Sequence, residues 1–286
     1  MSLLYPLIEK LNLTPIGDGK FYTSSLFIGS PTVYGGQVLA QSIVAAYNEL
    51  LGDKYLHSLH GYFLHPGDNE LMIEYEVEVI KLGKSFDTIR VKAIQNAKII
   101  FIMAASFHIM EQGIEHQASM PNVPLPDELR SFSEILKEAT ADKNIEMVGM
   151  FADDSPIIVR PVEHYNPFKP GIKPALTHFW FKPNGDYGSN NILNTALMAY
   201  ASDFGLLTTA LRPHNVSFFT QAMKIASLDH AMWFHQKEIS NDWHLYVVDS
   251  PWADNGRAFC RGNIFDKQGV LVASTTQEGL IRMFGK

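Results

Sequence analysis

The first half of the chain holds a long helical pattern that begins at two glycines. After Gly35-Gly36, apolar or small side chains recur at offsets of three and four residues, at Val38, Leu39, Ser42, Ile43, Ala46 and Leu50. The opposite side is also uncharged, since it carries Gln37, Gln41, Ala45 and Asn48. A helix with so few charges around its circumference is expected to be wrapped by other elements on several sides.

After this helix the hydrophobic period changes to two. In residues 71–79 every odd position is apolar, and three successive even positions are Glu. This alternation predicts a half-buried strand with one face in water. Residues 86–95 and 99–109 continue as strands separated by short turns, which indicates an antiparallel meander. One helix followed by such a meander predicts a curved sheet wrapped around the helix.

The same plan occurs again in the second half. The predicted elements there are a helix and four strands, at residues 191–211, 223–234, 243–249, 257–266 and 270–277. Similar strings also recur at similar spacing, since 48 residues separate Ser58 from Ser106 and 47 separate Ser227 from Ser274. A period this long favours a duplicated small domain over a solenoid.

Between the halves the pattern is interrupted, which divides the chain into three parts. Residues 120–126 are rich in proline, which is typical of a linker. We expect an N-terminal domain at 1–110, a linker at 111–175 with a surface helix and a connecting strand, and a C-terminal domain at 176–286. The remaining predicted elements are helices over 2–12 and 127–143 and strands over 20–29, 157–162 and 177–182.

The composition excludes several classes of protein. Hydrophobic residues make up 46% of the 286 residues and charged residues 19%, so each half can bury a core. A net charge of −7 disfavours a nucleic-acid-binding surface, which usually needs a basic face. We find no membrane-length apolar stretch, no signal-peptide pattern and a single cysteine, Cys260, which cannot form an internal disulfide. The chain is therefore expected to be cytoplasmic, with neither a nucleic acid nor a membrane as partner.

Asp203 is the first candidate for chemistry. It follows Leu197, Met198, Tyr200 and Ala201 in an apolar helical pattern. A buried, unpaired carboxylate is very costly, so Asp203 either faces solvent or is held by hydrogen bonds. One interpretation is a surface or structural carboxylate, and the other is a general base or a group that orients water.

Ser227 and Gln277 are polar residues in the second strand series. Ser227 precedes Asp229-His230, which suggests a hydrolase triad, but there is no Gly-x-Ser-x-Gly motif and strand neighbours point to opposite faces. Ser227 is therefore interpreted as a hydrogen-bond partner rather than a nucleophile. The Gln277 amide donates and accepts simultaneously, which suits holding a water in one orientation, although a lone strand-end Gln is most often an exposed edge residue.

The histidines and glycines leave simpler interpretations open. His57 and His60 share a face on a helix but not on a strand, and no carboxylate or cysteine completes a zinc set, so neither a metal nor a cofactor is expected. Gly35-Gly36 at a helix start either offers free N–H groups to an anion or carbonyl, or only permits close packing. Cys260 alternates with Arg257 and Arg261 and is expected to face the core without a reactive thiol.

Seven ordered strings over residues 5–282 carry a resemblance to a known family. They are Tyr34-Gly35-Gly36-Gln37, His57-Ser58-Leu59-His60-Gly61-Tyr62-Phe63, Pro66-Gly67-Asp68, Arg160-Pro161-Val162-Glu163, Tyr200-Ala201-Ser202-Asp203, Asp229-His230-Ala231-Met232-Trp233-Phe234-His235 and Ala273-Ser274-Thr275-Thr276-Gln277-Glu278-Gly279. In this order they resemble acyl-CoA thioesterase II. The resemblance implies an α+β double hot-dog fold, in which two long helices are each wrapped by an antiparallel sheet and the sheets join side by side.

The resemblance also implies an activity and a site. The expected reaction is hydrolysis of medium- to long-chain acyl-CoA to fatty acid and coenzyme A, without metal or covalent intermediate. Carried over from the family, Asp203, Ser227 and Gln277 surround the attacking water, with Asp203 as the base. Ser stands at the middle position, where the family often has Thr; both supply a hydroxyl, but Ser lacks the methyl that limits rotation. Backbone N–H groups at a helix start are expected to hold the oxyanion.

Further expectations concern the rest of the substrate and the assembly. The acyl tail is expected in an apolar slot between helix and sheet, and the nucleotide end near surface Lys or Arg. The first-half positions Gln41–Ser42, Ser58 and Ser106 do not reproduce the polar set, so one site per chain follows. We expect a homo-oligomer, either a dimer or a tetramer.

Two alternatives remain open at this stage. A hot-dog enoyl-CoA hydratase needs an Asp-His pair as base and acid, and the adjacency of Asp229 and His230 on one strand argues against that pairing. A non-catalytic acyl-CoA-binding module needs no such set of polar residues. Thiol release by the protein separates both from a thioesterase.

Overall fold

The computed structural model describes residues 2–142, 149–164, 166–188 and 190–284. The elements of the first half are α1 (Leu4–Leu11), β1 (Thr14–Gly17), β2 (Lys20–Thr23), α2 (Gly35–Asn48), β3 (Tyr55–Phe63), β4 (Ile73–Lys81), β5 (Phe86–Gln95) and β6 (Lys98–His108). The segment between the halves holds η1 (Pro126–Glu128), α3 (Phe132–Thr140), η2 (Gly149–Phe151) and β7 (Ile157–Pro161). The second half holds β8 (Leu176–Pro183), α4 (Asn191–Ser202), η3 (Leu207–His214), β9 (Met223–Ser227), β10 (Asp229–Phe234), β11 (His244–Asp254), β12 (Arg257–Asp266) and β13 (Leu271–Met283).

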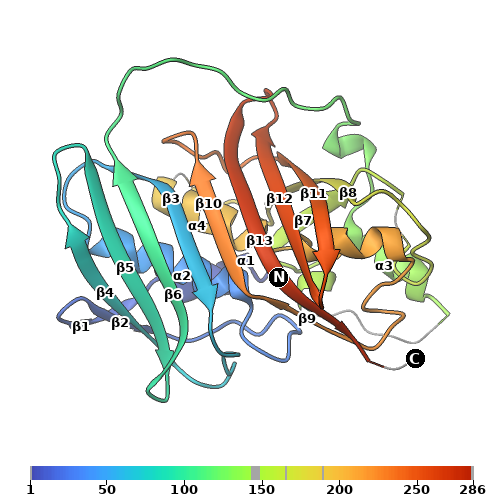
Figure 1. Cartoon of the computed structure of the whole chain (residues 1–286), viewed down its shortest axis with the longest axis horizontal. Coiled ribbons are helices and arrows are strands. Elements are labelled where there is room, and N and C mark those ends of the chain that lie inside the picture. Colours follow the sequence, from blue (N-terminus) through green and yellow to red (C-terminus); the bar gives the residue numbers. More distant parts are fainter. Residues whose placement is uncertain (1, 143–148, 165, 189, 285–286) are drawn as a thin grey trace.

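One continuous antiparallel sheet runs through both halves, with α2 and α4 on the same face of it (Figure 1). Its order is β1-β2-β4-β5-β6-β3-β10-β13-β12-β11-β8-β7, and β9 pairs with β13 beside this path. The halves join where β3 pairs with β10, from Asp229 opposite Tyr62 to Trp233 opposite Ser58. This is the predicted arrangement of two helices, each wrapped by a meander, with the sheets side by side.

The start of α2 and the end of α4 come into close contact at the glycines. A Cβ on Gly36, near the start of α2, would lie 2.4 Å from the carbonyl oxygen of Tyr200 near the end of α4, so only glycine permits this approach. The Tyr34 hydroxyl donates a hydrogen bond to the same carbonyl at 3.0 Å. The close contact explains why a residue from the first half reaches the candidate site of the second half.

The segment that leaves β6 covers the outer face of the second half. In β8, Phe179 and Phe181 belong to the core beside the helices. Trp180 lies between them in the strand, so its indole lies on the opposite face of the sheet. There it packs with Met120 and Val123, and its Nε1–H donates to the Pro124 carbonyl at 2.9 Å. β7, inside the predicted linker, pairs with β8 at the edge of the sheet. The domain limits at residues 110 and 175 stay a prediction.

The predicted helix over residues 191–211 is wrong beyond Ser202. α4 ends there, Asp203 is its C-cap, and a separate 3₁₀ helix begins at Leu207. Gly205 has φ of +71°, a conformation that stops a helix. The apolar periodicity continues across this break, so the pattern alone did not reveal it.

Several other element limits differ from the prediction, including the ends of β11 and β13, which extend to Asp254 and Met283 rather than to 249 and 277. The strand expected over 20–29 ends at Thr23, and the strand expected over 223–234 is split at Leu228 into β9 and β10. The helix expected over 127–143 begins only at Phe132, because Ser131 caps α3 by accepting the Glu134 N–H. The end of that prediction, Lys143, lies outside the described residues.

The serine spacing is not evidence of equivalent positions. Ser58 and Ser106 are cross-strand partners, whereas Ser227 pairs with Gly279 and Ser274 pairs with Trp233. Spacing along the chain counts residues, but register depends on turn lengths and on breaks such as the one at Leu228. The duplication is present in the fold, but these four serines do not occupy equivalent positions in its two halves.

Two expectations from composition can be compared with the structure. Cys260 is buried in β12, and burial raises the pKa of its thiol to about 11, as suits an unreactive core residue. In the described part of the chain, no helix combines the length and apolar character needed to cross a membrane.

Candidate functional site

Asp203, Ser227 and Gln277 come together at the end of α4. Oδ1 of Asp203 accepts hydrogen bonds from Ser227 Oγ at 3.2 Å and from Gln277 Nε2 at 2.8 Å. Gln277 Nε2 also donates to Ser227 Oγ. We call these three residues the polar cluster. The side chains lie 24 and 74 residues from Asp203 along the chain, so only the fold brings them together.

The first half completes the hydrogen bonds of the carboxylate. Oδ2 of Asp203 accepts the backbone N–H of Gly36, in the first turn of α2, at 2.9 Å. A helix N-terminus has free N–H groups, so the start of α2 supplies a donor to this carboxyl group. Both interpretations of Gly35-Gly36 hold in part. The glycines permit close packing of the helices, and the N–H of Gly36 binds a carboxylate, which belongs to Asp203 of the same chain. This N–H is therefore already engaged and differs from the free oxyanion donor expected at a helix start.

The strand geometry explains how Ser227 and Gln277 reach Asp203. β9 and β13 are paired, with Ser227 opposite Gly279, two residues from Gln277. Alternate residues of β13 face the helices, and Thr275, Gln277 and Gly279 are the buried set. Gln277 is only 1% exposed, so its amide needs partners at both ends.

His230 supplies the partner for the other end of the Gln277 amide. Its Nδ1 lies 3.3 Å from Gln277 Oε1 and its Nε2 lies 3.0 Å from Ser202 Oγ. Burial lowers the pKa of His230, although Asp203 and the bond to Gln277 act in the opposite direction. Sequence reasoning considered His230 only beside Asp229. Asp229 instead accepts the Glu278 N–H at 2.6 Å, so it is engaged with β13. The inward position of His230 follows from strand alternation, but its two partners do not.

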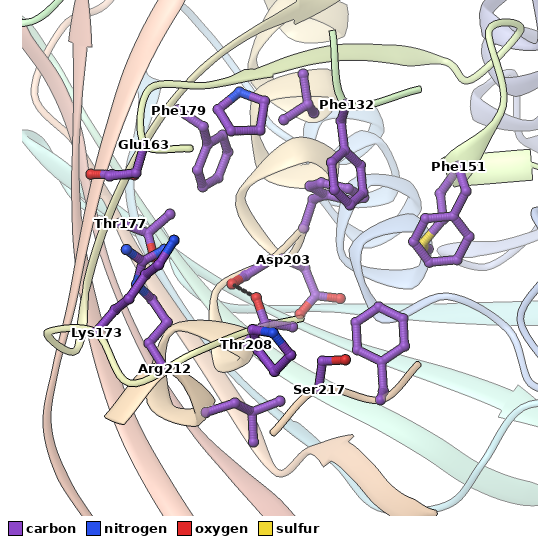
Figure 2. A pocket seen from close by; sticks show the side chains of 18 of the residues that line it. Phe132, Phe151, Glu163, Lys173, Thr177, Phe179, Asp203, Thr208, Arg212 and Ser217 are labelled. Carbon is purple, nitrogen blue, oxygen red and sulfur yellow. Dashed lines mark hydrogen bonds between the residues drawn. The ribbon is translucent and has the colours of Figure 1, made fainter. Parts of the chain in front are cut away.

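A cavity of about 190 Å³ borders the cluster at Asp203. Figure 2 shows Phe132 and Phe151 on one side of the Asp203 carboxylate and Lys173 and Arg212 on the other. Phe132 comes from α3 and Phe151 from η2, so the segment between the halves forms part of the wall. Other walls come from β7, β8 and η3. The sequence predicted a slot between helix and sheet and did not predict this contribution of the linker.

The lining differs in character between the two sides of the cavity. On the apolar side, Phe204 packs against Phe132 and Phe218 packs against Phe151. On the polar side, Glu163, Thr177, Lys173 and Arg212 lie together, with Phe179 among them (Figure 2). The pKa of Glu163 is lowered because hydrogen bonds from the ring and backbone N–H of His178 outweigh its burial. Tyr34 also lines the cavity, and burial together with the nearby Asp203 carboxylate raises the pKa of its hydroxyl well above the usual range.

The other histidines have neighbours of different kinds. His57 Nε2 lies 2.8 Å from Ser106 Oγ, His235 Nε2 lies 3.0 Å from Ser274 Oγ, and His60 packs edge-on against Trp233. Across the residues that the structure describes, no group of three or more His, Cys, Asp or Glu is arranged to hold a metal ion.

The polar residues that the sequence singled out in α2 are engaged in packing. Gln41 Nε2 donates to the carbonyls of Lys10 and Ser24, both at 3.1 Å, and its Oε1 accepts the Tyr75 hydroxyl at 2.6 Å. Ser42 donates to the Val38 carbonyl of its own helix at 2.8 Å. Gln41 therefore ties α2 to neighbouring segments. The expectation of one site per chain stays a prediction.

Comparisons with known proteins give a consistent result for the whole chain. Residues 147–280 match the family model described as acyl-CoA thioesterase, and residues 24–108 match the model of the acyl-CoA thioesterase N-terminal domain. Acyl-CoA thioesterase 2 of Haemophilus influenzae is 40% identical over 281 residues, with 98% of each chain covered. Human acyl-coenzyme A thioesterase 8 is 34% identical, with 96% of this chain and 88% of the human protein covered.

Solved structures confirm the fold. The acyl-CoA thioesterase II TesB2 of Mycobacterium marinum superposes with a TM-score of 0.78 at 32% identity, covering 98% of both chains. A hot-dog protein of Alicyclobacillus acidocaldarius gives a TM-score of 0.80 at 17% identity and the same coverage. The α+β double hot-dog fold expected from the resemblance is therefore correct.

Proposed function

Because the chain belongs to the acyl-CoA thioesterase II family and is a thioester hydrolase, we propose that it hydrolyses medium- to long-chain acyl-CoA at the polar cluster. The observation that carries this proposal is the Asp203 carboxylate, which three donors hold at the wall of a largely apolar cavity. An acyl thioester combines an apolar chain with a carbonyl that a water must reach. The cavity and the carboxylate match those two parts.

In this mechanism the attacking water donates a hydrogen bond to Asp203 from the cavity side. In the structure both Gln277 Nε2 protons and the Ser227 hydroxyl proton are used within the cluster, so a bound water takes over one of these bonds. Ser227 and Gln277 thereby orient the carboxylate and the water together. Orientation of this kind removes part of the entropic barrier to attack.

The chemical steps balance without a metal or a covalent intermediate. Asp203 accepts a proton as the water oxygen bonds to the thioester carbonyl carbon, which produces a tetrahedral oxyanion. The carbon–sulfur bond then breaks, and the proton on Asp203 goes to the coenzyme A thiolate. General-base assistance of this kind contributes roughly 10²–10⁴ in rate.

The direct experiment replaces the proposed base. Asp203→Asn keeps the size of the side chain but removes the proton acceptor, so kcat is expected to fall by roughly 10²–10⁴ with the fold intact. Thiol release from a long-chain acyl-CoA measures the rate. Asp229→Asn is the matched control, since this nearby carboxylate binds the Glu278 N–H outside the polar cluster. Near wild-type turnover by Asp203→Asn would show that the base is assigned wrongly.

The apolar side of the cavity is proposed to hold the acyl chain. Phe132→Ala and Phe151→Ala would each lengthen the apolar part of the cavity. The preferred acyl chain should therefore become longer in both variants. The control is Phe27→Ala, because Phe27 is 60% exposed and does not line the cavity. An unchanged chain-length profile in both variants would place the acyl chain elsewhere.

The polar side is proposed to face the coenzyme A moiety. Lys173 and Arg212 line it, and cations complement the phosphates of coenzyme A. Arg212→Gln should raise KM for acyl-CoA while leaving KM unchanged for the same acyl group on a short thiol without a nucleotide. Equal changes for both substrates would indicate that Arg212 acts on cavity shape rather than on charge.

The hydratase and the non-catalytic binding module lose support. The relatives named as thioesterases make the chain a hydrolase rather than a binding module. The hydratase alternative needed an Asp-His pair, and the two candidates bind other partners: His230 lies against Ser202 and Gln277, and Asp229 accepts from β13. Assembly into a dimer or tetramer and a cytoplasmic location stay predictions.

A further inference from the structure

His230 lies directly behind the polar cluster and does not line the cavity. It is fully buried at the start of β10, opposite Gly61 of β3. Its ring bridges two polar side chains, Gln277 on β13 and Ser202 at the end of α4. Gln277 in turn contacts Asp203. Because Asp203 accepts hydrogen bonds, it determines which atom donates in each of the other contacts.

The first step concerns the Gln277 amide. An ionised carboxylate only accepts hydrogen bonds, and Asp203 Oδ1 lies 2.8 Å from the nearer end of that amide. This end must therefore be the NH₂ group. The oxygen, Oε1, then points away from the site and towards the ring of His230, 3.3 Å from Nδ1.

The second step concerns the His230 ring. An amide oxygen cannot donate, so Nδ1 must carry a proton for this contact to be a hydrogen bond. Burial lowers the pKa of His230, so the ring is neutral at neutral pH and has one proton. Nε2 is then bare and needs a donor. Ser202 Oγ, at 3.0 Å, is the donor available to it.

The third step concerns the one proton of Ser202. Its hydroxyl lies 3.0 Å from His230 Nε2 and 2.9 Å from the Ala199 carbonyl, and it can donate to only one of them. If it donated to Ala199, Nε2 would have to carry the ring proton. Nδ1 and Gln277 Oε1 would then face each other as two acceptors. Turning the amide over would only move this conflict to Asp203.

From this chain of donors we propose that His230 is a positioning residue for hydrolysis, which as its Nδ1–H tautomer holds the Gln277 amide with its NH₂ group towards Asp203. The proposal deepens the proposed function and rests on it, because it assigns His230 a role only if the polar cluster performs the reaction. In this series of hydrogen bonds, Ser202 donates to His230, His230 donates to Gln277, and Gln277 donates to Asp203. Each side chain in this series fixes the orientation of the next.

The tautomer can be observed without any reaction. Nitrogen-15 NMR of histidine-labelled protein distinguishes the two ring nitrogens, and the His230 signals are assigned by their loss in His230→Asn. We expect the wild-type ring to be protonated on Nδ1 and bare on Nε2. In Ser202→Ala, which removes the donor to Nε2, the Nε2–H form should gain population. A wild-type ring protonated on Nε2 alone would overturn the proposal.

The kinetic test uses two replacements of His230. Asn places an amide N–H near the position of Nδ1 and should retain most of kcat, whereas Leu offers no donor and should lower kcat by about 10², the cost of a misplacement of about 1 Å. KM should change little, since His230 does not line the cavity. Equal losses in Asn and Leu would overturn the proposal, because a role in packing alone does not distinguish a donor.

A double variant separates positioning from general destabilisation. In a Gln277→Ala background, His230→Leu should cost little further activity, because the group it positions is already absent. Full additivity would contradict the proposed path. If Asp203→Asn keeps its activity, the proposed function fails while the NMR result stands by itself. If Asp203→Asn is inactive and His230→Leu is fully active, only the role of His230 fails.

Discussion

The two halves share one plan but use their buried polar groups differently. In the first half, Gln41 of α2 ties the helix to Lys10, Ser24 and Tyr75. In the second half, Asp203 at the end of α4 gathers Ser227, Gln277 and a backbone N–H beside a cavity. The plan of a helix wrapped by a sheet occurs twice, and the side chains decide which copy can carry chemistry.

The two halves also contribute different groups to the contact between them. The first half contributes the N–H of Gly36 and the hydroxyl of Tyr34, and the second half contributes the carboxylate and its side-chain donors. At the junction, Gly61 of β3 lies opposite His230 of β10. A Cβ on Gly61 would lie 2.4 Å from the Phe101 ring, so a side chain at this position would require that ring to move.

The largest effect is expected from substitutions that disrupt the polar cluster of the second half. Ser227→Ala and Gln277→Ala should each lower kcat by about 10²–10³, the usual cost of losing one oriented donor. The double variant should lose far less than the product, since both residues serve one carboxylate and one water. Thiol-release kinetics on the three variants measure this. Multiplicative losses would mean that the two residues act independently.

The second effect tests the buried histidines of the second half. Burial lowers the pKa of His244 from its ordinary 6.5 to about 4. Between these values the unfolded chain binds a proton that the folded chain does not, so the free energy of unfolding decreases as the pH falls from about 6.5 to about 4. The pKa difference corresponds to about 3 kcal/mol.

Urea unfolding at pH 7 and at pH 4 measures this loss. His244→Gln should reduce the difference in unfolding free energy between the two pH values. Burial shifts the pKa of His230 in the same direction, so part of the dependence remains in His244→Gln. An identical pH dependence in His244→Gln and wild type would contradict the assignment.

A third change tests the contribution of the first half to the site. Gly36→Ala would force a methyl group against the Tyr200 carbonyl and the Tyr34 ring, and it should displace the N–H that Asp203 accepts. We expect kcat to fall by about 10² if this displaces Asp203 by about 1 Å. Gly113→Ala is the control, because a Cβ there meets nothing within 4 Å. Full activity in Gly36→Ala would mean that the cluster does not depend on the first half.

The smallest effect should appear in stability alone. Gln41→Leu keeps the bulk of the side chain but leaves the buried Tyr75 hydroxyl without its acceptor, which costs about 2 kcal/mol. Denaturant unfolding should show this loss while kcat stays at the wild-type value. A loss of kcat in the folded variant would show that the polar groups of the two halves are not functionally separate.

Much of the architecture could be predicted from local patterns. The period of two in residues 71–79 predicted β4, and the uncharged circumference of residues 35–50 predicted a wrapped helix, which is α2. Breaks caused by single residues were missed. α4 stops at Ser202 although apolar residues continue, and β9 and β10 separate at Leu228 inside an unbroken strand pattern. Such breaks depend on φ angles and on contacts with other elements.

By itself the sequence determined which residue types are present, where helices and strands form, and that the plan occurs twice. These follow from hydrophobic period and turn chemistry, which act between near neighbours in the chain. Only the tertiary structure decided that Gly36 donates to Asp203, that His230 lies behind Gln277, and that Phe132 and Phe151 line the cavity. These contacts join residues far apart in the chain, and their geometry depends on strand register and helix packing, which no local pattern contains.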